Sequence, residues 1–149
     1  MSGLPELLAG QRAPGTYRWP VGPDVDVTDV RHFVEHAGWR FAHHDGWGEE
    51  TRDDVLAGLG FALDFPGHYG HNLDALADCL RDVVPPERVG TVLLWDGWGS
   101  FARADEPAFA RVLTVLAAHA VAALERADLD PHATGVLREL ASAATDRAV

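Results

Sequence analysis

Three aspartates, Asp74, Asp78 and Asp82, follow one another at intervals of four residues. On a helix this spacing places the carboxylates in one row, opposite the leucines of the same segment. The helix dipole would favour Asp74 in the first turn, but it gives Asp78 no such stabilisation. Like charges four residues apart cost a helix roughly 0.2–0.5 kcal/mol per pair. The row therefore suits a partner that carries positive charge, with a merely solvated helix face as the alternative interpretation.

Paired histidines raise the question of a metal site. His32 and His36 are four residues apart, and His68 and His71 are three apart, so either pair could ligate zinc from a helix. No cysteine pair and no His-Glu-x-x-His motif completes a ligand set. We therefore expect these histidines to be surface or loop residues, and we expect no bound metal and no cofactor.

The same residues give little support to an enzyme. Asp74 and Asp78 would lie side by side on one helix, whereas the two carboxylates of a glycosidase face each other across a cleft. A carboxylate beside Cys79 disfavours a thiolate nucleophile, so Cys79 is expected to pack as a small apolar residue. The sequence contains no phosphate-binding loop, nucleophile elbow or dinucleotide fingerprint. We therefore expect no catalytic residue and no catalytic activity.

Hydrophobic periodicity predicts the helices and strands that position these side chains. Thr51 and Asn72 are suited to be N-caps of the second and third predicted helices. A continuous apolar run ending at Trp95 is typical of a central parallel strand, and the following Gly97 and Gly99 predict a turn. Helices are predicted at residues 28–37, 51–63, 72–82 and 107–124, and strands at 39–43, 91–95 and 134–137. This alternation predicts an α/β domain with a small parallel sheet.

The N-terminal segment is rich in glycine and proline, and we expect loops there. Within it, residues 16–19 alternate in polarity and predict a possible extra edge strand. The length of 149 residues is that of one ordinary domain. We therefore interpret residues 1–149 as a single domain in which residues 1–27 form a loop-rich extension.

The charge balance limits the class of partner. The chain has 23 acidic and 12 basic residues and a formal net charge of −11. Nucleic acids and anionic membranes repel such a chain, so neither is expected as the main partner. A basic protein is favoured, although acidity that only keeps the protein soluble is the alternative.

Cysteine content and the absence of targeting patterns predict the cellular compartment. With Cys79 as the only cysteine, no intrachain disulfide can form, which favours a reducing compartment. The first residues lack the pattern of a signal peptide, and the longest apolar stretch, residues 112–124, is too short to span a bilayer. We therefore expect a cytoplasmic protein.

The most specific motif is a tight loop that leads into the acidic helix. It comprises Pro66, Tyr69-Gly70, Asn72-Leu73-Asp74-Ala75-Leu76 and Asp78-Cys79-Leu80. This run resembles the barstar family of intracellular ribonuclease inhibitors. Weaker similarity includes Gly38-Trp39-Arg40, residues 91–98 and residues 109–115.

The resemblance implies a small three-stranded parallel sheet packed by helices. It also implies an immunity-like inhibitor, as in a toxin–antitoxin pair, whose loop and acidic helix block the active site of a basic, barnase-like ribonuclease. The aspartate matching Asp78 would take the place of the RNA phosphate and pair with the enzyme's arginines and histidine, while the one matching Asp74 supports it. The residues expected to bind the partner are Asp78, Asp74, His68, Tyr69, Gly70, Asn72, Ala77 and Asp82.

Three positions depart from the family's type member. It has an aromatic residue in place of His68, a tryptophan in place of Ala77, and a glutamate near Ala118. These differences keep open a second interpretation, in which the chain is a barstar-fold interaction module whose basic partner is not a nuclease.

Overall fold

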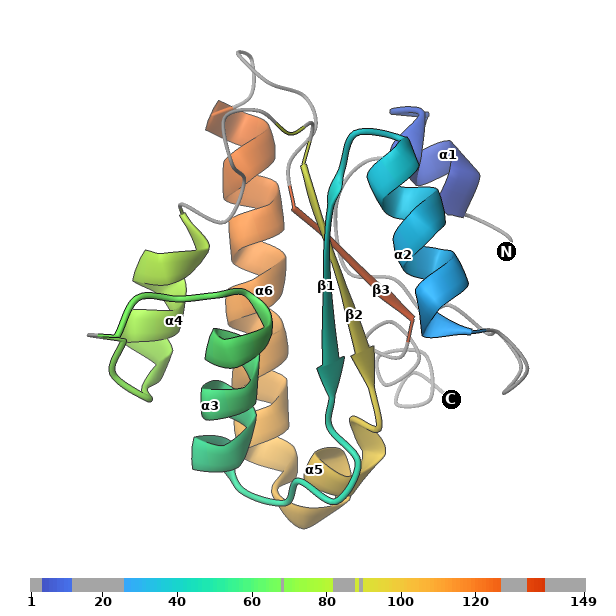
Figure 1. The fold of residues 1–149 in the computed structure, drawn as a ribbon. Helices are drawn as coiled ribbons and strands as arrows, with labels where there is room; N and C mark the ends of the chain where they lie inside the picture. The colour runs from blue at the N-terminus through green and yellow to red at the C-terminus, as the bar shows by residue number, and fades with distance from the viewer. Residues whose placement is uncertain are drawn as a thin grey trace, which may run out of the picture.

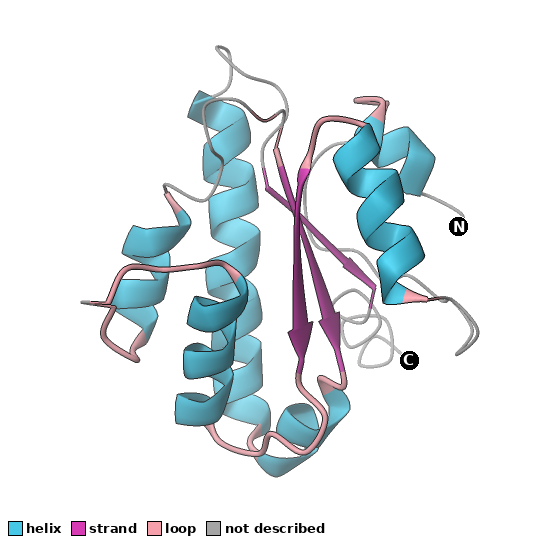
Figure 2. Cartoon of the chain, in the orientation of Figure 1, coloured by secondary structure: helices cyan, strands magenta, loops and turns pink. Residues whose placement is uncertain are grey.

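The computed structural model of the chain describes residues 4–11, 26–67, 69–81, 88, 90–126 and 134–138, and gives the backbone alone for 117–126 and 134–138. Helices and strands alternate along the chain, so the predicted α/β class is confirmed (Figures 1 and 2). The possible edge strand at residues 16–19 lies outside the described residues. In chain order the elements are α1 (Leu4–Leu8), α2 (Val27–His36), β1 (Arg40–Asp45), α3 (Arg52–Ala62), α4 (Leu73–Leu80), β2 (Thr91–Asp96), α5 (Gly99–Ala104), α6 (Glu106–Arg126) and β3 (Thr134–Arg138).

The sheet has the strand order β1-β2-β3, and each neighbouring pair is parallel. The expected parallel pairing of residues 39–43 with residues 91–95 is confirmed, with Arg40 opposite Thr91 and Asp45 opposite Asp96. All six residues of β2 are buried. This central strand is therefore covered on both faces, which explains its continuous apolar sequence.

Two hydrophobic clusters cover the two faces of the sheet. On one face, β2 contributes Leu93 and Trp95 to a cluster that includes residues of α3, α4 and α6. On the other face, Val92 and Leu94 pack with leucines of α1 and valines of α2. Figure 1 shows the sheet between these two groups of helices. In the described part of the chain, no helix has both the length and the apolar character that a membrane span requires.

Helix α1 corrects the prediction that the first 27 residues are loops. Leu4, Leu7 and Leu8 are buried in the second cluster, and the indole nitrogen of Trp39 donates a hydrogen bond to the carbonyl oxygen of Leu8 at 3.2 Å. Pro5 is tolerated because the N–H groups of a first helical turn have no partner within the helix. Overall glycine and proline content concealed a short helix that is stabilised by tertiary contacts.

A polar pair lies at the end of β1, beside the core. Nε2 of His44 is 2.7 Å from Oε1 of Glu49, and the two side chains are 5% and 19% exposed. Burial, with smaller contributions from Asp54 and Asp45, raises the pKa of Glu49 from 4.5 to about 7. Burial, reinforced by His43 and opposed by Asp45, lowers the pKa of His44 from 6.5 to about 4. Between about pH 4 and pH 7 the proton therefore lies on the carboxyl group of Glu49, which donates a hydrogen bond to the neutral imidazole of His44.

Glu49 and His44 make opposite contributions to the pH dependence of stability. The stability contributed by Glu49, whose pKa is raised, is present below pH 4.5 and is lost as pH rises through about 7. The stability contributed by His44, whose pKa is lowered, is present above pH 6.5 and is lost as pH falls through about 4. The two contributions oppose each other, so the intact pair causes little change between about pH 4.5 and 6.5.

Replacing Glu49 with glutamine should expose the His44 contribution. Glutamine still donates to His44, so the free energy of unfolding of Glu49→Gln should fall relative to the parent as pH decreases from 6.5 to 4.5. The difference should grow by up to about 1.4 kcal/mol per pH unit, the value for one proton. Urea denaturation across this range measures it, with Glu50→Gln, at an exposed neighbour, as the charge-matched control. Parallel curves for the two variants would contradict the analysis.

Gly58 should resist replacement although it lies within α3. Alanine is normally about 1 kcal/mol better than glycine in a helix. Here a Cβ atom would collide with the imidazole of His44 and lie 2.9 Å from Oε2 of Glu49. Gly58→Ala should therefore destabilise the protein by about 1–3 kcal/mol. Gly67→Ala, where no atom lies within 4 Å of the added Cβ, is the control in thermal melts. A higher melting temperature for Gly58→Ala would refute the predicted collision.

Candidate functional site

Helix α4 presents its acidic residues outward because its leucines hold its other face in the core. Leu76 and Leu80 are buried, Leu73 packs at the edge of the same cluster, and α4 packs against α6. Asp74 and Asp78 are exposed. The predicted position of this acidic row opposite the leucines is thus confirmed for the two described aspartates.

The start of α4 has the predicted N-cap. The side-chain oxygen of Asn72 accepts a hydrogen bond from the backbone nitrogen of Ala75 at 2.8 Å. The backbone nitrogen of Asn72 donates to the carbonyl oxygen of Gly70 at 2.7 Å. Because the cap fixes the direction in which the helix begins, it also fixes where Asp74 and Asp78 point.

Tyr69 attaches the loop between α3 and α4 to α3. Its hydroxyl group donates to the carbonyl oxygen of Leu56 at 3.0 Å, and its ring meets the Phe65 ring edge to face, with centroids 4.9 Å apart. Burial is the main cause that raises the pKa of Tyr69 to about 12, so the hydroxyl remains a donor at neutral pH. A Cβ atom at Gly60 would lie 2.6 Å from this ring, so glycine permits the close contact.

The electrostatic surroundings of Asp78 include a cation that the sequence analysis missed. Nη1 of Arg81 lies 2.9 Å from Oδ1 of Asp78, and the two side chains are 58% and 70% exposed. The spacing of three residues on a helix was the signal that could have revealed this pair. Exposed pairs of this kind contribute about 0–1 kcal/mol, so Asp78 can exchange Arg81 for another cation at little cost.

The remaining expected residues divide into two groups. Gly70 is exposed, and Ala77 and Tyr69 are partly buried, on the same continuous loop and helix as the two aspartates. His68 and Asp82 lie outside the described residues. The Tyr69 ring is also close to His71, with centroids 5.4 Å apart. Six of the eight expected residues therefore lie in the described part of this loop and helix.

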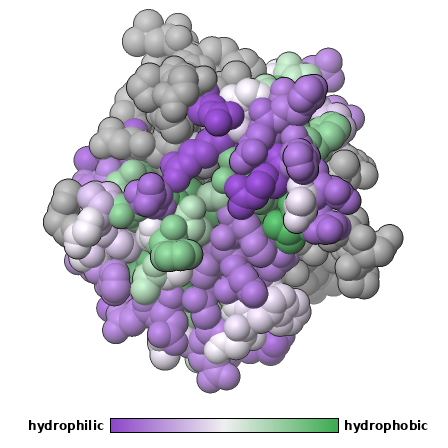
Figure 3. Space-filling model, in the orientation of Figure 1, coloured by the Kyte–Doolittle hydropathy of each residue, from purple (hydrophilic) through white to green (hydrophobic). Residues whose placement is uncertain are grey.

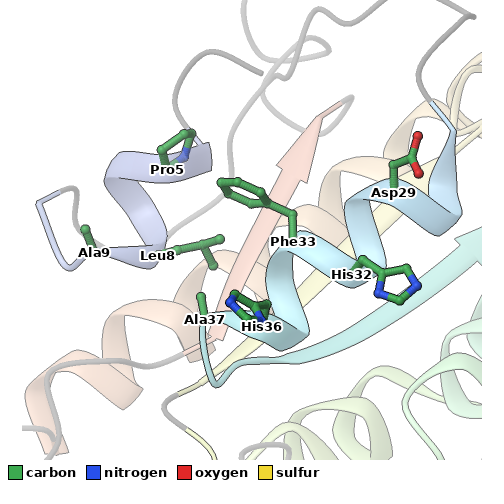
Figure 4. Close-up of a pocket in the computed structure, with 8 residues that line it drawn as sticks. All are labelled: Pro5, Leu8, Ala9, Asp29, His32, Phe33, His36 and Ala37. Carbon is green, nitrogen blue, oxygen red and sulfur yellow. The ribbon is translucent and has the colours of Figure 1, made fainter.

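A separate cavity of about 650 Å³ lies between α1 and α2. His32, His36 and Phe33 line it, and Figure 4 shows the two imidazole rings at different places along α2. Among the described residues, no three or more histidine, cysteine, aspartate or glutamate side chains are grouped so as to hold a metal ion. This cavity lies across the sheet from α4, on the face covered by α1 and α2 (Figure 1).

Comparison with known proteins identifies one family. The family model described as Barstar (barnase inhibitor) matches residues 39–134, nearly two thirds of the chain. The matched segment includes β1, β2 and all of the loop and helix described above. A search of curated proteins found no match.

The N-cap provides a test of how firmly this surface is held. Asn72→Ala should lower the free energy of unfolding by about 1 kcal/mol, because the amide of Ala75 loses its acceptor. Asn72→Asp keeps an acceptor oxygen at the helix start and should remain close to the parent. Urea denaturation of the three proteins measures the difference. Equal stability of Asn72→Ala and the parent would show that the cap does not hold the helix start.

Proposed function

Since the chain belongs to the barstar family, we propose that it binds a basic ribonuclease and blocks its active site with the loop and the acidic face of α4. The residues proposed to contact the enzyme are Asp78, Asp74, His68, Tyr69, Gly70, Asn72, Ala77 and Asp82. We further propose a single domain that acts in the cytoplasm as an immunity-like protein, with no catalytic step of its own.

The observation that carries the proposal is the outward display of Asp74 and Asp78 on α4 of a chain with net charge −11. A ribonuclease must attract the phosphates of RNA, so its active site concentrates positive charge. A carboxylate held on a rigid helix can occupy the position of a phosphate and accept charge-assisted hydrogen bonds from arginine. The buried leucines of α4 supply that rigidity.

Asp78 is the better of the two candidates for the central contact. Asp74 lies in the first turn, where the helix N-terminus already stabilises its charge. Asp78 lies further along and is paired only with the exposed Arg81 among the contacts described for it. A guanidinium group of the enzyme could replace Arg81 and gain more, because an interface excludes the water that weakens the exposed pair.

Asp78→Ala should therefore weaken binding far more than it affects folding. The exposed aspartate contributes little to the fold, and alanine is the better helix former, so stability should remain level or rise slightly. Loss of the carboxylate from a closed interface leaves the partner's cations unpaired, which costs about 2–5 kcal/mol of binding free energy. Asp74→Ala should cost less. Thermal melts and titration of barnase activity on RNA measure the two effects.

The controls separate this contact from general electrostatics. Glu50→Gln removes one exposed negative charge away from α4 and should bind nearly as well as the parent. Association should slow as salt increases for all variants, because long-range attraction steers an acidic protein to a basic one. If Asp78→Ala inhibits as strongly as the parent, α4 is not the contact surface. If the parent inhibits neither barnase nor other basic ribonucleases, a partner that is not a nuclease becomes the favoured interpretation.

A further inference from the structure

A second surface lies next to the proposed binding helix and contains a highly exposed aromatic side chain. Phe61, near the end of α3, is 91% exposed. It lines a cavity of about 430 Å³ together with Phe65, Tyr69, Asp64 and His71. We call this cavity the aromatic groove. Figure 3 shows a hydrophobic patch over the end of α3, on a face that is otherwise mostly hydrophilic.

The fold does not require an aromatic residue at the position of Phe61. The buried side of α3 is formed by Val55, Leu56 and Leu59, and Phe61 lies on the opposite side of the helix. A large apolar side chain in water is unfavourable by about 1.5–3 kcal/mol relative to a buried one. A single exposed apolar residue is common on protein surfaces, but Phe61 lines one cavity with Phe65 and Tyr69, and a contiguous group of this kind is typical of a binding surface.

The groove has a firm backbone. The amide of Phe65 donates to the carbonyl oxygen of Gly60 at 2.9 Å, and the amide of Asp64 donates to that of Phe61 at 3.3 Å. These are the two hydrogen bonds of a Schellman motif, in which glycine is usual at the position that Asp64 occupies with φ of 57°. The motif fixes Asp64 and Phe65 at the groove, and the hydrogen bond from Tyr69 to Leu56 fixes its other wall.

The groove is continuous with the proposed binding surface. Tyr69 belongs both to the groove and to the loop that leads into α4. The exposed residues of α4 are Asp74 and Asp78, and α4 contains no aromatic residue, whereas specific interfaces usually depend on a few large anchors, often aromatic. The aromatic residues that α4 lacks are supplied by the adjacent groove.

We propose that the aromatic groove receives an arginine side chain of the basic partner that contacts α4. This inference rests on the proposed function and extends the interface from α4 to α3. Aromatic faces attract a guanidinium group, and the carboxylate of Asp64 at the groove supplies its counter-charge. Lysine fits less well, because its compact ammonium group is strongly hydrated and does not stack on rings. A purely apolar side chain would leave the carboxylate of Asp64 without a counter-charge in the interface.

The groove can be tested without the natural partner. The probe is N-acetyl-arginine amide, titrated into the ¹⁵N-labelled full chain and monitored by NMR. The amides of Phe61, Asp64, Phe65 and Tyr69 should shift more with this probe than with N-acetyl-lysine amide. They should also shift more than with N-acetyl-citrulline amide, which has nearly the same shape but no charge.

Variants identify the groups responsible. Phe61→Ala should remove most of the shift, and Asp64→Asn should reduce it while preserving the backbone, since asparagine also tolerates positive φ. Trp47→Ala removes a different exposed aromatic side chain, 70% accessible and outside the groove, and should leave the shift unchanged. Equal shifts with all three probes, or a shift that persists in Phe61→Ala, would overturn the proposal.

A binding experiment distinguishes failure of this inference from failure of the proposed function. If the parent inhibits barnase, Phe61→Ala should weaken inhibition by about tenfold, a typical effect of losing an aromatic anchor. Full inhibition by Phe61→Ala together with loss of inhibition in Asp78→Ala would overturn the groove and support α4. If the parent does not inhibit, the proposed function fails, and the arginine titration alone decides whether the groove binds guanidinium.

Discussion

The burial of β2 on both faces is the constraint on which the rest of the molecule depends. A strand with six buried residues requires a layer of helices on each side, and the two hydrophobic clusters are those layers. One layer uses the leucines of α1 and the valines of α2. The other uses α3 and α6, to which α4 adds Leu76 and Leu80. Burial of these two leucines fixes the rotation of α4 about its own axis, so the side opposite the leucines faces outward.

The sequence predicted those parts of the structure that depend on local chemistry. Asn72 and Thr51 each have a side-chain oxygen suited to cap a helix, and both accept the expected hydrogen bonds. The apolar run of β2 is long enough and continuous enough to indicate a central strand. The outward position of Asp74 and Asp78 followed from helical spacing alone, since their phase relative to Leu76 does not depend on tertiary structure.

Other features depend on residues far apart in sequence and had no local signal. Helix α1 is only five residues long, and it is stabilised by Trp39, 31 residues beyond Leu8. The His44–Glu49 pair depends on Gly58, because a larger residue at that position of α3 would collide with both side chains where α3 packs against β1. The exposure of Phe61, in contrast, could have been predicted from the sequence. An apolar residue on the polar side of a predicted helix conflicts with amphipathic packing and therefore merits attention as a contact residue.

The acidic row and the aromatic groove would contribute to binding in different ways. Carboxylates on α4 act over about a Debye length, so they accelerate encounter with a basic protein and favour its orientation. Because water and Arg81 already stabilise Asp78 in the free protein, the net gain from pairing it with a partner is limited by desolvation. The free protein exposes Phe61 to water without compensation, so its burial carries no such cost. An interface that uses both surfaces would gain faster association from the acidic row and slower dissociation from the paired Asp78 and the buried Phe61. The fold makes this combination possible because Tyr69, fixed to Leu56, joins the two surfaces on one rigid support.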